Sequence, residues 1–229
     1  MAILSTDLMD IQFKDAHDKD YDESEIFSKY EPDDIVRDFH LSSYQIIGRE
    51  KWGRALAFKN KLLTCNHLLD EKPFLIYKTE DGLEPIPLTE IWRDAENDVA
   101  VISPPRIYAK MPSGKKISVK LRNTNYSLGD SDKIEVGDYV MIPRSPQMEW
   151  GEYFGDGKIV GKEPFGEFKK RKHLMMYDVH CTKGDSASPI IGLYDGVPHI
   201  LGFHSAYLYS SDGYKVSVGV KINEYKKYL

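Results

Sequence analysis

Residues 182–189, Thr-Lys-Gly-Asp-Ser-Ala-Ser-Pro, are the most informative stretch of this 229-residue chain. Gly184 lies two residues before Ser186 and allows a sharp turn. Such a turn can aim the backbone N–H groups of both residues into one small space, as in an oxyanion hole beside a nucleophilic serine. The apolar run PIIG (189–192) follows and would anchor the turn in a core. Taken alone, the stretch also fits an ordinary β-turn, since Gly, Asp and Ser are common turn residues.

Two earlier segments hold the partners that a serine nucleophile needs. His67 follows an apolar run in LLTCNHLL (62–69), and a serine hydroxyl is a weak nucleophile that requires an adjacent base such as His. Asp98 directly precedes the apolar run VAVI (99–102), where a carboxylate could orient the imidazole. Each has a simpler interpretation on its own, His67 as a half-buried core histidine and Asp98 as a turn or cap acid.

The three segments together, in the order His, Asp, Ser, resemble the trypsin-like (chymotrypsin-fold) peptidases. The family patterns T-A-A-H, D-hydrophobic-A and G-D-S-G-S-P stand here as TCNH, DVAV and GDSASP. The resemblance implies His67 as general base, Asp98 as its orienting acid and Ser186 as nucleophile, with Gly184 and Ser186 as the oxyanion-hole donors. It also implies an all-β fold of two six-stranded antiparallel β-barrels, with the active site in the cleft between them.

The sequence departs from the family pattern close to two of these residues. Ala187 follows the candidate nucleophile where the family usually has Gly, and its methyl group would crowd the turn if the backbone needs an unusual angle. Cys65 and Asn66 replace two small residues before His67. Neither change removes a catalytic group.

The run HILGFHSA (199–206) carries a second histidine of interest, His204. A His after Gly and an apolar residue resembles two branches of the family, the bacterial glutamyl endopeptidases and the main proteases of positive-strand RNA viruses. In both, this His lies at the base of the substrate pocket and donates a hydrogen bond to Glu or Gln. A buried carboxylate or amide oxygen needs such a donor. We therefore expect cleavage after Glu or Gln, with an ordinary strand histidine as the alternative.

The expected pocket also includes three residues that precede the nucleophile in the sequence. Both branches usually have a Thr five residues before the Ser; here that position is Cys181, and Thr182 comes one residue later. His180 occupies the place where trypsin-type pockets carry an acid, so specificity for basic residues is not expected. We assign Cys181, Thr182 and His180 to the substrate-binding site with His204.

The wider pattern predicts three regions. Residues 1–40 contain 12 acids and 4 bases, so we interpret 1–41 as an acidic N-terminal extension outside the main core. From residue 42, short apolar or alternating runs are separated by Gly, Pro, Asn and Asp, as in barrels and sandwiches. A polar stretch at 123–131 divides this part, which predicts barrels at 42–125 and 126–229. One large sandwich is the structural alternative.

Composition excludes several classes of protein. Hydrophobic residues make up 41% and charged residues 29%, and the net charge of −5 argues against a bulk nucleic-acid coat. No run approaches the roughly 18 apolar residues of a membrane span, and the first residues lack the features of a secretory signal, which favours a cytoplasmic location, in the host if the protein is viral. Two cysteines, Cys65 and Cys181, exclude a disulfide framework but allow one disulfide or two free thiols. No metal or cofactor is implied.

The partner expected from these observations is a polypeptide substrate, which could be the protein's own polyprotein. Few cysteines, the missing signal and the His204 pattern favour a viral polyprotein-processing enzyme. A bacterial glutamyl endopeptidase and an intracellular regulatory peptidase are alternatives. A catalytically silent barrel that binds RNA or protein is the alternative from another class. In that case a basic run would form a weak RNA contact; it consists of Lys169, Lys170, Arg171 and Lys172. A solvated hairpin tip is the simpler interpretation of this run.

Overall fold

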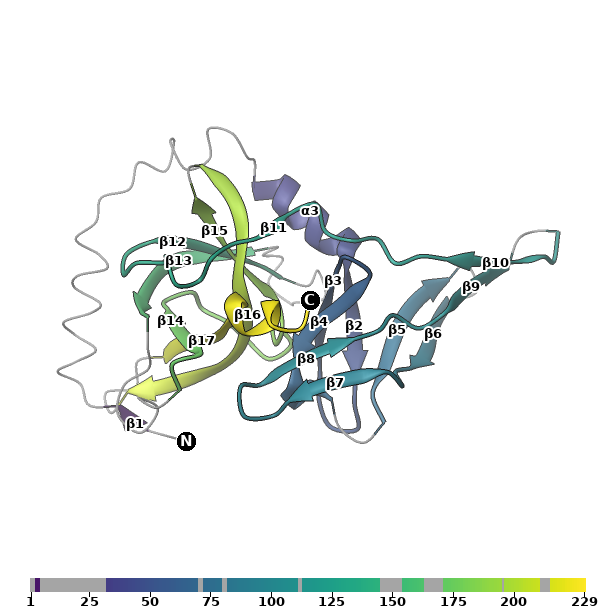
Figure 1. The fold of residues 1–229 in the computed structure, drawn as a ribbon, viewed down its shortest axis with the longest axis horizontal. Helices are drawn as coiled ribbons and strands as arrows, with labels where there is room; N and C mark the ends of the chain where they lie inside the picture. The colour runs from purple at the N-terminus through teal and green to yellow at the C-terminus, as the bar shows by residue number, and fades with distance from the viewer. Residues whose placement is uncertain are drawn as a thin grey trace.

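The computed structural model describes residues 3–4, 32–69, 72–79, 82–110, 113–144, 154–162, 171–194, 196–210 and 215–229, and every structural statement below concerns these residues. Two β-sheets lie side by side, with a helix packed across one end of the boundary between them (Figure 1). The elements in chain order are β1 (Ile3–Leu4), α3 (Pro32–Ser42), β2 (Ser43–Ile47), β3 (Trp52–Phe58), β4 (Lys61–Cys65), the 3₁₀ turn η1 (Asn66–Leu68), β5 (Phe74–Thr79), β6 (Gly82–Pro87), β7 (Ile91–Asp94), β8 (Val99–Ile102), β9 (Ile107–Lys110), β10 (Lys116–Val119), β11 (Ser127–Leu128), β12 (Tyr139–Pro143), β13 (Phe154–Gly161), β14 (Leu174–Tyr177), β15 (Pro189–Tyr194), β16 (Val197–Ser210), β17 (Lys215–Lys221) and α4 (Ile222–Lys226).

The C-terminal sheet is a closed barrel. Its path runs β16-β15-β12-β13-β14-β17, and the pairing of β17 with β16 closes the ring of six strands. The short strands β1 and β11 add to β16 in parallel. Strands β12 and β13 form an antiparallel hairpin in this barrel, in which Tyr139 pairs with Lys158.

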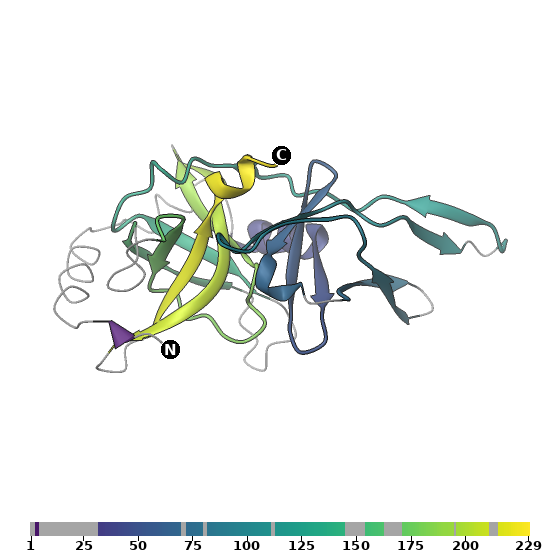
Figure 2. The same cartoon turned by 60° about the horizontal axis from the view of Figure 1, so that its bottom comes forward.

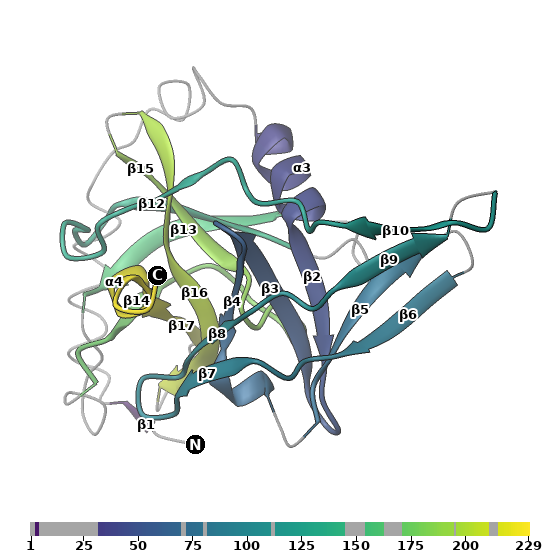
Figure 3. The same ribbon diagram turned by 45° about the vertical axis from the view of Figure 1, so that its right-hand side comes forward.

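The N-terminal sheet is curled but open. Its path runs β6-β5-β2-β3-β4-β8-β7, and among the described residues no pairing joins the end strands β6 and β7. It therefore has seven strands in a half-barrel, where we predicted six strands in a closed ring. Strands β9 and β10 form a separate hairpin, which projects from the body beside β5 and β6 (Figures 2 and 3). The all-β architecture of two sheets is as predicted.

Continuous apolar runs become strands here because both of their faces are buried. In β4, Leu62 belongs to the interior of the N-terminal sheet, whereas Leu63 faces the C-terminal barrel. In β8, Ala100 and Val101 alternate in the same way, as expected for a period of two residues. The cluster that fills the space between the sheets, named the interface cluster below, draws on both halves and includes Leu56, Leu63, Val99, Val101, Met141, Val160, Met176, Ile191 and Phe203.

Helix α3 belongs to this core, although it lies in the segment that we expected outside it. Its apolar residues Ile35 and Phe39 are 3% exposed and join the interface cluster. Their i, i+4 spacing puts both side chains on one helix face. The buried carboxylate of Asp38 accepts hydrogen bonds from Thr124 and Asn125 and so holds the segment that connects the sheets. The acidic composition of residues 1–40 hid this short amphipathic helix, while the region boundaries themselves stay predictions.

No helix within the described ranges has the length and apolar character needed to cross a membrane.

Candidate active site

The pairing of β4 with β8 brings His67 and Asp98 together. Cys65 at the end of β4 lies opposite Val99 at the start of β8. His67 is in the 3₁₀ turn that follows β4, and Asp98 is the residue just before β8. His67 Nδ1 lies 2.8 Å from Asp98 Oδ2, and the backbone N–H of His67 donates to Oδ1 over 2.8 Å. Both carboxylate oxygens therefore hold the histidine.

Asp98 has one further partner that the sequence analysis did not identify. Ser205 Oγ donates to Asp98 Oδ2 over 2.5 Å, from β16 of the opposite barrel. Burial raises the pKa of Asp98, but hydrogen bonds and charge from His67 and the bond from Ser205 outweigh it and leave the pKa lowered. Asp98 is thus a carboxylate at neutral pH. The available signal was the position of Ser205 directly after His204, but a strand serine is too common to single out.

The turn that carries Ser186 uses alternate backbone N–H groups. Asp185 N–H donates to Thr182 O, Ala187 N–H to His204 O, and Ser188 N–H to Asp185 O. Within the described residues no hydrogen bond occupies the N–H groups of Gly184 and Ser186. These are the two donors expected to form an oxyanion hole, and the turn itself does not use them.

Strand β3 of the N-terminal sheet supports this turn from outside. Gly184 has φ +103°, and a Cβ built there would lie 2.1 Å from the Trp52 ring. The backbone N–H of Arg54 donates to Ser186 O over 3.0 Å. Ala187 has φ +62°, so the alanine that replaces the family's glycine does occupy the left-handed region. None of the β3 residues could be assigned from sequence, because they lie about 130 residues before the turn.

Ser186 is half-buried, and among the described contacts no hydrogen bond joins its hydroxyl to His67. The structure therefore brings His67 and Asp98 into direct contact and anchors the Ser186 turn through β3, but it shows no direct Ser186–His67 bond. Such bonds are often long without substrate and tighten when substrate binds.

His204 is buried beside Tyr177. It is 2% exposed, and its Nδ1 lies 2.5 Å from the Tyr177 hydroxyl oxygen. Burial, with smaller contributions from His67 and Lys215, lowers the pKa of His204 to about 3. Burial also raises the pKa of Tyr177 well above its usual value. Both groups are therefore neutral at physiological pH. The sequence analysis did not identify Tyr177 as a partner of His204, because a tyrosine in an apolar strand looks like a core residue.

The other predicted pocket residues have different surroundings. Cys181 is fully buried, and its carbonyl accepts a hydrogen bond from Lys215 Nζ. The Thr182 hydroxyl donates to Asp185 Oδ2 over 3.3 Å, so this bond directs it into the turn rather than toward a substrate. His180 is exposed, and its carbonyl accepts from Arg144. Cys65 and Cys181 are both free thiols.

Cys65, His67 and Asp98 have donor atoms within 4.8 Å of one another, a distance that a metal ion could bridge. Burial raises the pKa of Cys65 well above its usual value, so it is a thiol rather than the thiolate that metals bind. The His67 and Asp98 atoms are already bonded to each other. The donor set fits a hydrogen-bonded pair better than a metal site.

The basic run lies partly outside the described residues. Lys169 and Lys170 are not described, whereas Arg171 and Lys172 are exposed at the turn before β14. The predicted RNA contact there stays a prediction.

The solved structures with a similar fold include proteases. No protein-family model and no curated protein matches the chain. The HtrA-type protease AlgW with a tripeptide matches with a TM-score of 0.56 and 18% identity over 82% of this chain, which spans 58% of that protein's chain. The MamO protease domain from Magnetospirillum magneticum matches with a TM-score of 0.54 and 13% identity, covering 82% of this chain and 96% of that one. Together with the two sheets and the position of the site between them, this likeness shows that the chain has the double-barrel fold of chymotrypsin-type serine proteases.

Proposed function

We propose that the protein is a serine endopeptidase with Ser186, His67 and Asp98 as its catalytic triad. The proposal rests on the hydrogen bonds that fix the position of His67. Asp98 accepts from both the ring and the backbone of this residue and is itself fixed by Ser205. A core histidine has no need of an ionised carboxylate held from three sides, whereas a general base that becomes an imidazolium does.

In the proposed reaction, Ser186 Oγ attacks the carbonyl carbon of the scissile peptide bond while His67 accepts the hydroxyl proton. The negative charge that develops on the carbonyl oxygen is stabilised by the unused N–H groups of Gly184 and Ser186. His67 then donates the proton to the leaving amine, and an acyl-enzyme remains. Water, activated by the same histidine, hydrolyses the acyl-enzyme.

We propose further that cleavage follows Glu or Gln. A neutral phenol donates a hydrogen bond, so the Tyr177 hydroxyl donates to His204 Nδ1, and the neutral imidazole carries its proton on Nε2. That N–H is a single, oriented donor for the side-chain oxygen of Glu or Gln. In this proposal His204 and Tyr177 recognise the substrate side chain, since the Thr182 hydroxyl is bonded to Asp185.

Polyprotein processing for a virus in the host cytoplasm is the setting that we propose from the sequence patterns. A polypeptide substrate is common to this setting and to the glutamyl-endopeptidase and regulatory alternatives. The AlgW structure, solved with a tripeptide, is consistent with a peptide ligand in a chain of this fold.

The test of the triad is labelling with a fluorophosphonate probe, which reacts with activated serines. We expect wild-type protein to be labelled, Ser186→Ala to be unlabelled and Ser188→Ala, two residues away in the same turn, to retain labelling. Folded wild-type protein that stays unlabelled would favour the catalytically silent binding barrel. The N-terminus must be sequenced in parallel, because an unprocessed zymogen would also fail to react.

The test of the pocket is a matched set of peptides that differ only in Gln, Glu or Leu before the cleaved bond. We expect hydrolysis of the first two, and we expect His204→Asn to lower their kcat/KM by at least about 100-fold, since a buried polar oxygen is then left without its donor. Equal cleavage after Leu would remove the specificity proposal and leave the triad intact.

A further inference from the structure

The segment between Asp98 and Asp130 is the most one-sidedly charged part of the chain. It contains no acidic residue, although the net charge of the whole protein is −5. Its six basic residues are Arg106, Lys110, Lys115, Lys116, Lys120 and Arg122. Most of them lie on or beside the projecting hairpin of β9 and β10 (Figure 1).

The register of this hairpin separates its two faces. Tyr108 pairs with Ser118, and Lys110 pairs with Lys116, so these positions share one face. Arg106 and Lys120 lie just outside the ladder, and the two-residue alternation of the strands puts these positions on the same face. The other face is apolar, and its Ile107 is 1% exposed within the core of the N-terminal sheet. The hairpin thus presents a continuous polar and basic face, named the basic face below.

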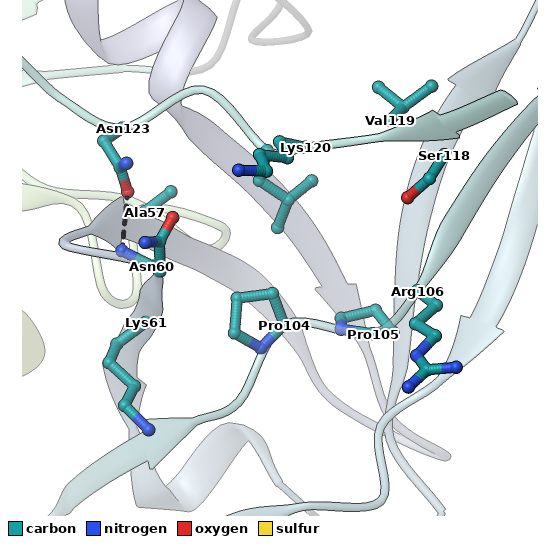
Figure 4. A pocket seen from close by; sticks show the side chains of 11 residues that line it. Ala57, Asn60, Lys61, Pro104, Pro105, Arg106, Ser118, Val119, Lys120 and Asn123 are labelled. Carbon is teal, nitrogen blue, oxygen red and sulfur yellow. Dashed lines mark hydrogen bonds between the residues drawn. The ribbon is translucent and has the colours of Figure 1, made fainter.

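The basic face leads into a cavity of about 270 Å³ at the base of the hairpin (Figure 4). Arg106, Lys120 and Lys61 line it, and no acidic residue does. Figure 4 shows Ser118 and Val119 pointing in opposite directions, with Ser118 on the side of the cavity. Three cations around one small cavity with no acidic residue favour an anionic group such as a phosphate.

The amide groups at the rim are held in place. Lys59 and Asn60 have φ of 45° and 59°, as a tight two-residue turn between β3 and β4 requires. The N–H of Asn60 donates to Asn123 Oδ1 over 3.1 Å, which joins this turn to the segment after the hairpin. The cavity is therefore closed on one side by an ordered wall.

Tyr108 distinguishes between the possible anionic partners. Its side chain is 49% exposed on the basic face, between Arg106 and the tip of the hairpin. An acidic peptide would use the cations alone, whereas a nucleic acid also offers bases that stack on an exposed aromatic ring.

We propose that the basic face binds the sugar–phosphate backbone of single-stranded nucleic acid, with a phosphate in the cavity and a base stacked on Tyr108. This site shares no residue with the candidate active site, so the proposal stands independently of peptidase activity. It also differs in position from the basic run at residues 169–172.

Fluorescence anisotropy of the full chain with labelled 12-nucleotide oligo(dT) and oligo(rU), between 50 and 300 mM salt, tests the proposal. We expect saturable binding that weakens with salt. Arg106→Ala/Lys120→Ala should weaken it at least about tenfold at 50 mM salt and lower the slope of log affinity against log salt by about 1.4, or 0.7 for each phosphate that is no longer neutralised. Tyr108→Ala should weaken binding at least about fivefold, while Tyr108→Phe, which keeps the ring, should not.

The matched control is Lys133→Ala/Lys226→Ala, which removes the same charge from two exposed lysines of the C-terminal half. Unchanged binding in this control supports the basic face, and an equal loss overturns it in favour of unspecific attraction. Absence of saturable binding at 50 mM salt also overturns the proposal. Tighter, hairpin-dependent binding of a labelled ten-residue poly-Glu peptide would identify an acidic polypeptide as the partner instead.

Discussion

The two halves of the molecule position their parts of the active site in different ways. The C-terminal barrel is closed, so each of its six strands has a neighbour on both sides. It carries Ala187 in the left-handed region of the backbone and the buried neutral His204. The N-terminal sheet ends in two edge strands and carries the His67–Asp98 pair, in which Asp98 also has a positive φ of +57°.

This difference indicates what fixes the geometry of the site. Closure of a barrel is not required, because β4 and β8 are as well buried as the strands of the closed half. Both faces of these two strands are covered, one by the interior of their own sheet and one by the interface cluster. Strained conformations persist only where surroundings over-determine them, and the closed barrel together with β3 provides those surroundings for the Ser186 turn.

The largest effect is expected in the open half, at Asp98. Asp98→Asn keeps the shape of the residue but removes the charge that stabilises the imidazolium and selects the tautomer, so kcat should fall by about 10⁴-fold. Initial rates with a cleavable Gln or Glu peptide at saturating concentration measure it. Ser205→Ala is the matched control, since it keeps the carboxylate and should cost only about tenfold. Equal losses in the two variants would contradict the role assigned to the Asp98 charge.

The next effect tests the closed half, at Gly184. Gly184→Ala adds a methyl group to a residue with φ +103° whose Cβ position is occupied by the Trp52 ring. Displacement of the turn should lower kcat by about 10² to 10³-fold, the range for loss of an oxyanion-hole donor. Gly114→Ala is the control, because Gly114 also has a positive φ but nothing lies within 4 Å of its Cβ position. It should affect stability slightly and kcat not at all; a similar fall in kcat in both variants would refute the steric explanation.

A third prediction concerns pH and the buried His204. Its pKa in the folded protein is about 3, against an ordinary value of 6.5, so between these values the unfolded chain binds a proton that the folded chain does not. The free energy of unfolding should therefore fall as pH decreases below about 6.5, by up to about 1.4 kcal/mol per pH unit from this residue. Urea unfolding of wild type and His204→Asn at pH 7 and pH 5 measures it. The variant should lose stability less steeply than wild type; identical slopes would mean that His204 is not buried as a neutral group.

The smallest effect is expected at Ala187, which joins the two halves at the interface cluster. Ala187→Gly relieves the left-handed backbone strain of about 1–2 kcal/mol but gives up a buried methyl group and adds freedom to the unfolded chain. We expect the free energy of unfolding to change by less than about 1 kcal/mol in chemical denaturation, with kcat nearly unchanged. A large gain in activity would indicate that the methyl group of the alanine distorts the turn.

The sequence predicted the local parts of this structure well. Each of the runs around His67, Asp98 and Ser186 combines a chemical group with the apolar strand that positions it, and both kinds of information lie within about eight residues. The pattern of apolar runs also predicted the all-β architecture, because strands buried on both faces are apolar throughout.

What could not be predicted depends on contacts between distant segments. Trp52 supports Gly184, Ser205 holds Asp98, and Tyr177 orients His204 across separations that no local pattern records. Whether the N-terminal sheet closes into a barrel likewise depends on pairing between its distant end strands, β6 and β7. Helix α3 was missed for a different reason, since the acidic average over residues 1–40 concealed Ile35 and Phe39, the buried apolar residues on one helix face.

The interface cluster predicts how the protein would behave if the chain were cut between its two sheets. Leu63 and Val101 on one side, and Met176 and Phe203 on the other, belong to one shared apolar cluster, so separation of the halves would expose apolar surface on both. A chain divided between the two sheets would yield fragments that expose matching apolar faces and recover a complete active site only on reassociation. The fold is therefore suited to fragment complementation, in which assembly of the two pieces restores the contact between Asp98 and Ser205.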